Sequence, residues 1–321
     1  MHAIVYDRYG SPDRLRLEVL PTPVPGEGDV LVRVHAASVN SWDWDLLTGR
    51  PLNRIEAPFR PKHRVLGSDI AGVVEAVGPN VTRWQPGDAV FGDITDRGFG
   101  AFAEVVAVPE GLLARKPAAL NFEQAAAIPQ AGVLALQGLR ANGPLTAGQQ
   151  VLLNGAGGGV GTFAIQLARA SGAVITGVDA ADKLDLIRSL GAEHALDYRE
   201  VDFNRTGATY DLIVDVVAAR SVSDYRRALK PGGTAALIGG KVSAFLSAVA
   251  FGRRSSRNGE RAVQLLMWKA SAADLDTLAG LVEAGTVTPV IDQVLPLADA
   301  AEGLRQLGAG RVKGKIVLSL I

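Results

Sequence analysis

The 321-residue sequence contains no cysteine. Composition therefore excludes thiolate nucleophiles, disulfide bonds, zinc fingers and iron–sulfur clusters. Imidazole ligands are also scarce, because the four histidines are far apart and form no HxxH or HExxH motif. A transition-metal site is not expected from so few ligands. The histidines are His2, His35, His63 and His194.

The sequence also lacks a charge excess and a long apolar run. Lysine plus arginine number 33, as do aspartate plus glutamate, so no net charge attracts nucleic acid or an anionic membrane. The most apolar stretch outside recognisable elements, Val242–Phe251, is far shorter than the about 20 residues that span a bilayer. The first ten residues do not have the pattern of a signal peptide. We expect a cytoplasmic protein without a membrane or nucleic-acid partner.

Composition and hydrophobic pattern differ between two parts of the chain. Residues 1 to about 115 carry short apolar runs broken by proline and glycine, which is typical of an all-β, barrel-like domain. From about Asn121, alanine-rich helical stretches alternate with apolar runs, which is typical of a parallel sheet covered by helices. The last residues are again β-like. We predict an α/β protein with one domain at 1–120 and 287–321 and a second at 121–286.

Within the second domain the pattern predicts individual elements. Helices are expected over 162–172, 183–192 (capped by Gly191), 223–233 and 274–285. One strand is expected to end at the glycine turn, and three others are expected over 173–179, 210–217 and 233–240.

One glycine-rich turn carries the clearest chemistry. The segment NGAGGGVG, residues 154–161, directly follows a strand and directly precedes a helix. Ala156, Gly158 and Gly161 fit the Rossmann fingerprint, with alanine for the first glycine, and Gly159 and Val160 complete the turn. The helix N-terminus offers free N–H groups to a pyrophosphate. The context predicts a dinucleotide site.

An acid follows at the expected distance. Asp179 lies 179 − 158 = 21 residues after Gly158, close to the spacing of the acid that binds the adenine ribose. A carboxylate repels a 2′-phosphate, so it favours NADH over NADPH. Two alternatives remain: Asp179 or Asp182 caps the next helix, or Lys183 accepts the phosphate.

Taken together, the chain resembles the zinc-free quinone oxidoreductase and enone reductase branch of the medium-chain dehydrogenase/reductase superfamily. The resemblance covers nearly the whole chain and rests on segments 37–44, 65–78, 86–92, 100–109, 128–139, 154–168 and 314–320. It implies a GroES-like β-barrel catalytic domain, a Rossmann domain with a doubly wound parallel sheet, and a homodimer. The edge strand at Thr234–Gly239 is one possible dimer contact.

Departures from relatives narrow the chemistry that the resemblance implies. Asn40 replaces a zinc-binding cysteine of the alcohol dehydrogenases, and Gly67, Ser68 and Asp69 replace their GHE motif, so no zinc is expected. Asp45 and Leu134 stand where some relatives have tyrosine and threonine, which leaves the proton donor and the placement of the nicotinamide open. The implied reaction is hydride transfer from NAD(P)H to a small quinone or α,β-unsaturated carbonyl compound.

The resemblance supplies candidate catalytic residues, each with a structural alternative. Asn40 is expected to hold the substrate oxygen or the nicotinamide, or only loop backbone. Asp43 is expected to orient Asn40, or to cap a short helix over Trp44–Gly49. Trp44 or Trp42 is expected to line the pocket, or to lie in the core.

Further residues complete the expected site. Gly239 and Lys315 are assigned to the cofactor, although Lys315 could equally be a solvated lysine. The segment Phe251–Arg261 carries Arg253, Arg254, Arg257 and Arg261, as either a substrate-side or dimer loop or a solvated turn. Two other functions stay open: a zinc-type alcohol dehydrogenase, and a non-catalytic, cofactor-bound protein with an RNA-binding or structural role.

Overall fold

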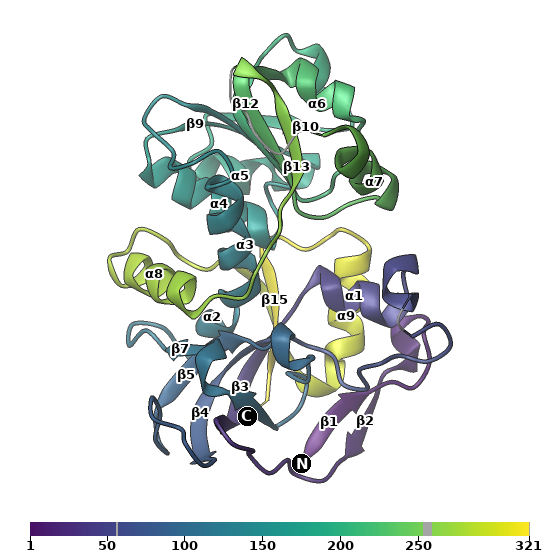
Figure 1. Ribbon diagram of the computed structural model, residues 1–321, viewed down its shortest axis with the longest axis vertical. Coiled ribbons are helices and arrows are strands. Elements are labelled where there is room, and N and C mark those ends of the chain that lie inside the picture. Colours follow the sequence, from purple (N-terminus) through teal and green to yellow (C-terminus); the bar gives the residue numbers. More distant parts are fainter. Residues whose placement is uncertain (56, 253–258, 321) are drawn as a thin grey trace. The chain divides into compact units, whose positions relative to one another are not determined.

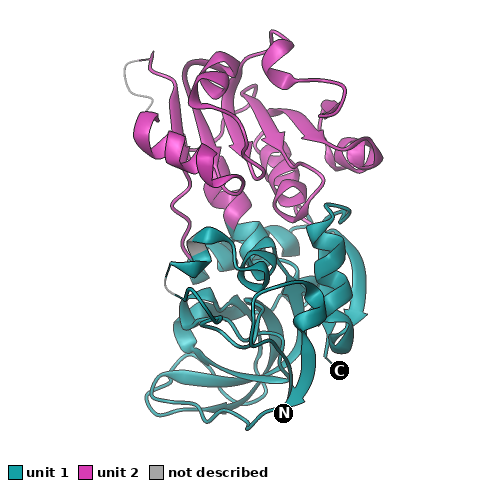
Figure 2. Cartoon of the chain, turned by 90° about the vertical axis from the view of Figure 1, so that its right-hand side faces the viewer, with its two compact units in different colours: residues 1–133, 270–285, 289–321 teal, residues 134–269, 286–288 magenta. Residues whose placement is uncertain are grey.

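The computed structural model describes residues 1–55, 57–252 and 259–320. The chain divides into two compact units, coloured separately in Figure 2. Unit 1 comprises residues 1–133, 270–285 and 289–321, and unit 2 comprises 134–269 and 286–288. Residues 121–133 and 270–285 were expected in the second domain but fall in unit 1. The reason is packing: α2 (Phe122–Ala126) contacts β3 (Asp29–Val39), and α8 (Ala272–Glu283) contacts β7 (Leu113–Arg115).

Unit 1 is built around a seven-stranded sheet with the order β14-β15-β3-β4-β5-β7, in which β6 also pairs with β3. Its further strands are β4 (Asp69–Val77), β5 (Ala89–Asp93), β6 (Val105–Pro109), β14 (Ile291–Pro296) and β15 (Lys315–Ser319), and β1 (His2–Val5) and β2 (Arg16–Val19) form a separate hairpin-like pair. The helices are α1 (Ser41–Thr48), α2, α8, α9 (Ala300–Gly308) and the start of α3 (Pro129–Leu139).

The long strand β3 organises this sheet. Its sequence DVLVRVHAASV buries most of its side chains, so both faces are covered rather than one. It pairs antiparallel with β4, β6 and β15, which brings the C-terminal strand beside an N-terminal one. The core beneath it includes Val32, Ile70 and Ile316. Polar residues at one end of these strands are consequently held on a rigid support.

Unit 2 is a six-stranded, fully parallel sheet with the order β10-β9-β8-β11-β12-β13. The strands are β8 (Gln150–Asn154), β9 (Val174–Asp179), β10 (His194–Asp197), β11 (Tyr210–Asp215), β12 (Leu229–Leu237) and β13 (Ala262–Leu265). Figure 1 shows α4 (Gly159–Ala170) and α5 (Leu184–Leu190) on one side, with α6 (Val222–Ala228) and α7 (Val242–Phe251) on the other. This is the doubly wound order, whose direction reverses between β8 and β11.

In the described residues, short 3₁₀ helices connect these elements: η1 (Pro12–Arg14), η2 (Pro51–Arg54), η3 (Thr95–Arg97), η4 (Glu110–Leu112), η5 (Ala181–Lys183), η6 (Phe203–Arg205) and η8 (Leu297–Asp299). None of the described helices is long and apolar enough to cross a bilayer.

The structure confirms the predicted fold class and corrects one strand position. Thr234–Leu237 belongs to β12, which lies between β11 and β13 and is no edge of the sheet. The end strand on that side is β13, which was not predicted because four residues give almost no periodic signal. Of the arginine-rich segment, Arg253, Arg254 and Arg257 lie outside the described residues. Arg261 is described, and its Nε donates to the carbonyl of Leu229 at 2.7 Å.

Candidate active site

The glycine turn between β8 and α4 has a backbone that side chains would not permit. Gly155 has a φ of +85°, a region that L-residues with a Cβ rarely adopt. A Cβ on Gly161 would lie 2.4 Å from the carbonyl oxygens of Gly155 and Ala156. Gly158 is the extended residue that precedes α4, so the amides of Gly159 and Val160 lie in its first turn. The turn thus presents backbone donors at the positive end of a twelve-residue helix.

Asp179 joins this turn directly. Its Oδ2 accepts from the amide of Gly157 at 2.9 Å, and its Oδ1 accepts from Ala180 at 2.8 Å. Neither η5 nor α5 has a side-chain cap, so the reading of Asp179 or Asp182 as a cap of the following helix is wrong.

Lys183 is buried rather than solvated. Its side chain is 7% exposed, and its Nζ lies 3.6 Å from Asp179 Oδ1. A Cβ on Gly157 would lie 2.8 Å from Lys183 Cβ, so the lysine stem covers the turn. The structure therefore groups the predicted turn residues, Asp179 and Lys183 in one place.

A second set of polar residues lies where the strand order reverses. Asn154 ends β8 and Asp215 ends β11, and the two are paired in register. Asp215 is fully buried and accepts from Asn154 Nδ2 at 3.0 Å, the amide of Val217 at 2.9 Å and the hydroxyl of Tyr225 at 2.8 Å. Ligands of doubly wound sheets bind outside the carboxyl ends of the strands at this point. Sequence reasoning missed this set, although Asp215 lies within a predicted strand and Asn154 directly follows another.

Gly239 follows β12 at the same edge of the sheet. Its carbonyl accepts from the amide of Ala218 at 2.8 Å, and a Cβ would lie 2.6 Å from the carbonyl oxygen of Val216. Close approach of two backbone segments thus accounts for glycine at this position, whatever its contact with a cofactor.

In unit 1, the amide of Asn40 is engaged on both sides. Its Nδ2 donates to Asp69 Oδ2 at 3.0 Å and to Ser68 Oγ at 3.3 Å, and its Oδ1 accepts from Lys315 Nζ. Gln130 Nε2 also donates to Ser68 Oγ, at 3.2 Å. Ser68 thus uses both oxygen lone pairs as acceptors, which leaves its hydroxyl hydrogen to donate.

Asp43 fixes the loop that carries Asn40. One carboxylate oxygen accepts from the amide of Asn40 and the other from the amide of Gly67, both at 2.8 Å. The side chain is 0% exposed, and burial raises its pKa to about 7. Asp43 therefore ties the start of α1 to the loop before β4. It also caps α1, as the N3 residue of a capping box in which Asn40 is the N-cap position.

Lys315 lies in this cluster of unit 1, whereas the glycine turn belongs to unit 2. It is 3% exposed, its Nζ also donates to the carbonyl of Val39 at 3.3 Å, and it lies 3.6 Å from Asp69 Oδ2. Burial lowers its pKa, and the charge of Asp69 opposes that effect. The solvated alternative is wrong. The structure groups the lysine with Asn40 instead of with the other cofactor candidates.

The two tryptophans differ in environment. The Trp44 ring packs on α9, since a Cβ on Gly308 would lie 2.4 Å from it, and it contacts the core of unit 1. Trp42 is 37% exposed and meets the Phe99 ring edge-on, with centroids 5.7 Å apart. Trp44 thus has a packing role irrespective of any substrate.

These residues can be tested against the groups that the fold implies. The glycine turn fits a dinucleotide, because a Cβ on Gly161 would clash with the backbone and the amides of Gly159 and Val160 lie at a helix start. The cluster does not fit zinc: its donors are an amide, a hydroxyl and Asp69, and the Lys315 ammonium already lies against them. In the described part of the chain, no three His, Asp or Glu side chains are close enough to hold a metal ion.

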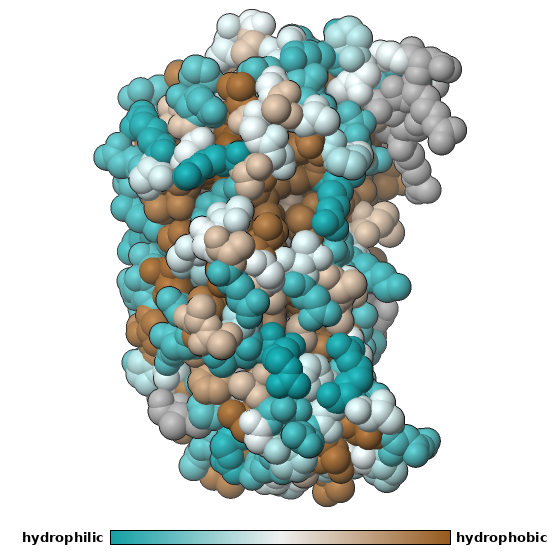
Figure 3. Space-filling model, turned by 90° about the vertical axis from the view of Figure 1, so that its left-hand side faces the viewer, coloured by the Kyte–Doolittle hydropathy of each residue, from teal (hydrophilic) through white to brown (hydrophobic). Residues whose placement is uncertain are grey.

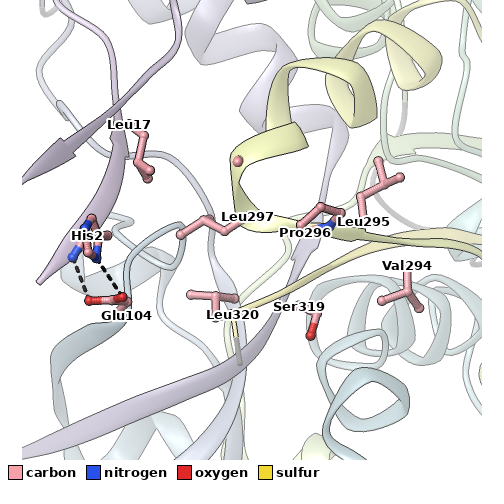
Figure 4. A pocket seen from close by; sticks show the side chains of 10 residues that line it. His2, Leu17, Glu104, Val294, Leu295, Pro296, Leu297, Ser319 and Leu320 are labelled. Carbon is pink, nitrogen blue, oxygen red and sulfur yellow. Dashed lines mark hydrogen bonds and ion pairs between the residues drawn. The ribbon is translucent and has the colours of Figure 1, made fainter.

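A separate pocket of about 600 Å³ lies elsewhere in unit 1 (Figure 4). Leu17, Leu297 and Leu320 line it, and His2 Nδ1 contacts Glu104 Oε1 at 2.9 Å at one end. None of the predicted site residues lines this pocket. Apolar residues also reach the surface in patches, which Figure 3 shows in brown on one face.

Comparisons with known proteins agree with this geometry. Residues 26–118 match the family described as "Alcohol dehydrogenase GroES-like domain", and residues 190–318 match "Zinc-binding dehydrogenase". The chain is 33% identical to 2-methylene-furan-3-one reductase of Solanum lycopersicum, over 99% of this chain and 79% of that protein.

Solved structures are similar over the full length. The quinone oxidoreductase from Coxiella burnetii has a TM-score of 0.87 at 28% identity, covering 100% of this chain and 99% of that one. A structure described as an NAD-dependent alcohol dehydrogenase has a TM-score of 0.84 at 32% identity and covers 100% of both chains. The chain belongs to the medium-chain dehydrogenase/reductase superfamily, among its quinone and enone oxidoreductases, which confirms the resemblance seen in the sequence.

Proposed function

We propose that this protein is a zinc-independent reductase that uses NAD(P)H to reduce a small quinone or an α,β-unsaturated carbonyl compound. The observation that carries the proposal is the buried Lys315 ammonium bonded to Asn40 and next to Asp69. A fixed cation in a buried site stabilises negative charge that develops on a substrate oxygen, the task that a metal performs in alcohol oxidation. Relatives named as quinone and enone reductases support the same reaction.

The chain's own residues divide the work between two sites. The amides of Gly159 and Val160 are proposed to bind the pyrophosphate, and Asp179 the adenine ribose. When bound, the cofactor supplies a hydride. In unit 1, the Lys315 ammonium and the Ser68 hydroxyl are the donors proposed to hold the substrate oxygen. Asp69 Oδ2 lies 3.6 Å from Lys315 Nζ, and Asp43 accepts from the amide of Gly67, the residue before Ser68. Conjugation in the substrate spreads the charge, so a few donors suffice.

We propose NADH as the preferred cofactor. The carboxylate of Asp179 lies against the turn, and the charge of Lys183 is already compensated by it at 3.6 Å. A 2′-phosphate would meet this carboxylate without an unpaired lysine beside it. One feature favours NADPH: Arg199 follows β10, the strand next to β9, and is exposed to solvent. Titration with both cofactors distinguishes the two.

Oligomeric state and location are also proposals. We propose a homodimer in the cytoplasm, as is implied by the family, and the end strand β13 now replaces Thr234–Gly239 as the candidate edge. Light scattering of the purified protein tests the dimer. A monomer at micromolar concentration would contradict it.

The experiment that tests the reaction compares three substrates on chelator-treated protein. We expect oxidation of NADH with 1,4-benzoquinone and with cyclohexenone, and no reduction of NAD⁺ with simple alcohols. Alcohol oxidation restored by added zinc would favour an alcohol dehydrogenase instead. Cofactor binding without turnover of any substrate, together with salt-dependent RNA binding, would favour the non-catalytic role.

A further inference from the structure

Two buried carboxyl groups face each other in unit 1. Asp69 on β4 and Asp93 on β5 are directly opposite in the antiparallel register, so both side chains lie on one side of the sheet, about 5 Å apart at Cβ. Asp69 is 0% exposed and Asp93 is 2% exposed. Two ionised carboxylates at this separation would repel each other strongly, because the buried surroundings screen charge poorly.

The partners of Asp69 identify it as the ionised member. Its Oδ1 accepts from the amide of Gln130 at 3.0 Å, and its Oδ2 accepts from Ser38 Oγ at 2.7 Å and Asn40 Nδ2 at 3.0 Å. Lys315 Nζ lies 3.6 Å away. Three hydrogen bonds and a cation stabilise a negative charge there.

Asp93 has a different environment. Its Oδ1 accepts from the amide and hydroxyl of Thr95, at 2.9 and 2.5 Å. Its Oδ2 has no hydrogen-bond partner in the described part of the chain. An unpartnered, buried, ionised oxygen is costly, whereas a neutral carboxyl group is tolerated. Burial and the charge of Asp69 both raise the pKa of Asp93, so it is the member that holds a proton.

That proton reduces the excess negative charge around the pair. The groups that face it are Asp43 from α1, Asp96 from η3 and Lys315 from β15, and Asp96 is exposed to solvent. The buried groups comprise three carboxyls and one ammonium, a net charge of −2 if all are ionised. One proton brings this to −1, and burial moves the pKa of Asp43 to about 7, so a second is partly bound near neutrality.

We propose that the Asp69–Asp93 pair holds one proton at neutral pH, carried by Asp93, and that Lys315 passes a proton from this pair to the reduced product. The delivery step rests on the proposed function. Reduction of a quinone or enone consumes one proton in addition to the hydride and its two electrons. The Lys315 N–H bond breaks as a bond to hydrogen forms on the product, the proton of the pair restores the ammonium, and solvent water returns a proton to the pair.

Infrared spectroscopy of the protein without cofactor tests whether the Asp69–Asp93 pair holds a proton at neutral pH. The wild type should show the carbonyl band of a protonated carboxylic acid at pH 7, and Asp93→Asn should remove a band that the matched exposed variant Asp96→Asn retains. Asp93→Asn imitates the neutral acid in size and charge, and circular dichroism checks that it folds. Identical spectra for Asp93→Asn and the wild type would overturn the proposal.

A second variant keeps the test independent of that substitution. The hydrogen bond from the Thr95 hydroxyl lowers the pKa of Asp93, and Thr95→Val removes this bond but keeps the one from the backbone amide. The variant should therefore move the titration midpoint of the same band to higher pH. A midpoint that stays in place or moves to lower pH would contradict the assignment to Asp93.

Kinetics test the delivery step. We expect Asp93→Asn to lower kcat with cyclohexenone about 100-fold, the usual scale of general acid catalysis, while the Kd for the cofactor stays unchanged. The wild-type rate should fall as pH rises and the pair loses its proton, and the variant should lack this basic limb. A kcat within two-fold of the wild type would overturn delivery. If the wild type reduces neither substrate, the proposed function and the proton delivery by Lys315 are both refuted. The infrared result still shows whether the Asp69–Asp93 pair holds a proton.

Discussion

Replacement of Asp179 with asparagine should move the cofactor preference from NADH toward NADPH. The amide oxygen of asparagine can still accept from Gly157, so the turn keeps its shape. One negative charge disappears, and the charge of Lys183, now 3.6 Å from that carboxylate, becomes uncompensated. Two unit charges 4 Å apart interact by about 1 kcal/mol in water and about 4 kcal/mol at an effective dielectric constant of 20. For this partly buried edge we expect about 1.5 to 3 kcal/mol, or about a 10- to 100-fold change in preference.

The assay is the ratio of kcat/KM for NADPH to that for NADH, measured with one quinone at low ionic strength. Asp182→Asn is the matched control, because it removes the same charge from an exposed residue three positions along the chain. The change should shrink at high salt, since exposed charges are screened. A ratio for Asp179→Asn that changes no more than that for Asp182→Asn would refute the assignment of Asp179 to the ribose.

Three further predictions follow. Gly161→Ala should weaken cofactor binding at least 10-fold in a fluorescence titration, because its Cβ would lie 2.4 Å from the carbonyl oxygen of Ala156. Unchanged binding would refute the assignment of this glycine turn to the pyrophosphate. Gly280→Ala should stabilise the protein by about 0.5 to 1 kcal/mol in urea unfolding, because the residue lies in α8 with no atom near the added Cβ. Finally, the folded state binds protons more tightly than the unfolded chain wherever burial raises the pKa of Asp43 and Asp93. These groups should therefore make wild-type stability fall as pH rises from about 4 toward 7 and above, and Asp93→Asn should gain stability relative to the wild type between pH 5 and 8.

The parts of the fold that sequence predicted are those encoded locally. The glycine turn, its strand and its helix occupy one contiguous segment, so spacing alone located Gly158 and Gly161. By contrast, α7 was not predicted, because VSAFLSAVAF has only two polar residues, Ser243 and Ser247, and eight apolar ones, so its amphipathic pattern is weak. The strand β10 was missed because it has only four residues.

The buried cluster could not be predicted from local sequence patterns, because its residues are far apart in the sequence. Lys315 and Asn40 are 275 residues apart in sequence, and Asp69 and Asp93 meet only because β4 and β5 pair in one particular register. The sequence suggested Asn40 as the residue that holds the substrate oxygen or the nicotinamide, or only loop backbone. The structure shows that the side-chain nitrogen and oxygen of Asn40 are both hydrogen-bonded within the protein. Lys315 and Ser68 are therefore the donors that we propose for the substrate oxygen.

The most direct test of the proposed reaction follows the hydride itself. NADH carrying deuterium at the transferred position of its nicotinamide would be mixed with metal-free protein and cyclohexenone, and the product analysed by nuclear magnetic resonance. We predict cyclohexanone with deuterium on the carbon β to the carbonyl group. Deuterium on the carbonyl carbon, as in an alcohol product, or no transfer of deuterium, would contradict the account.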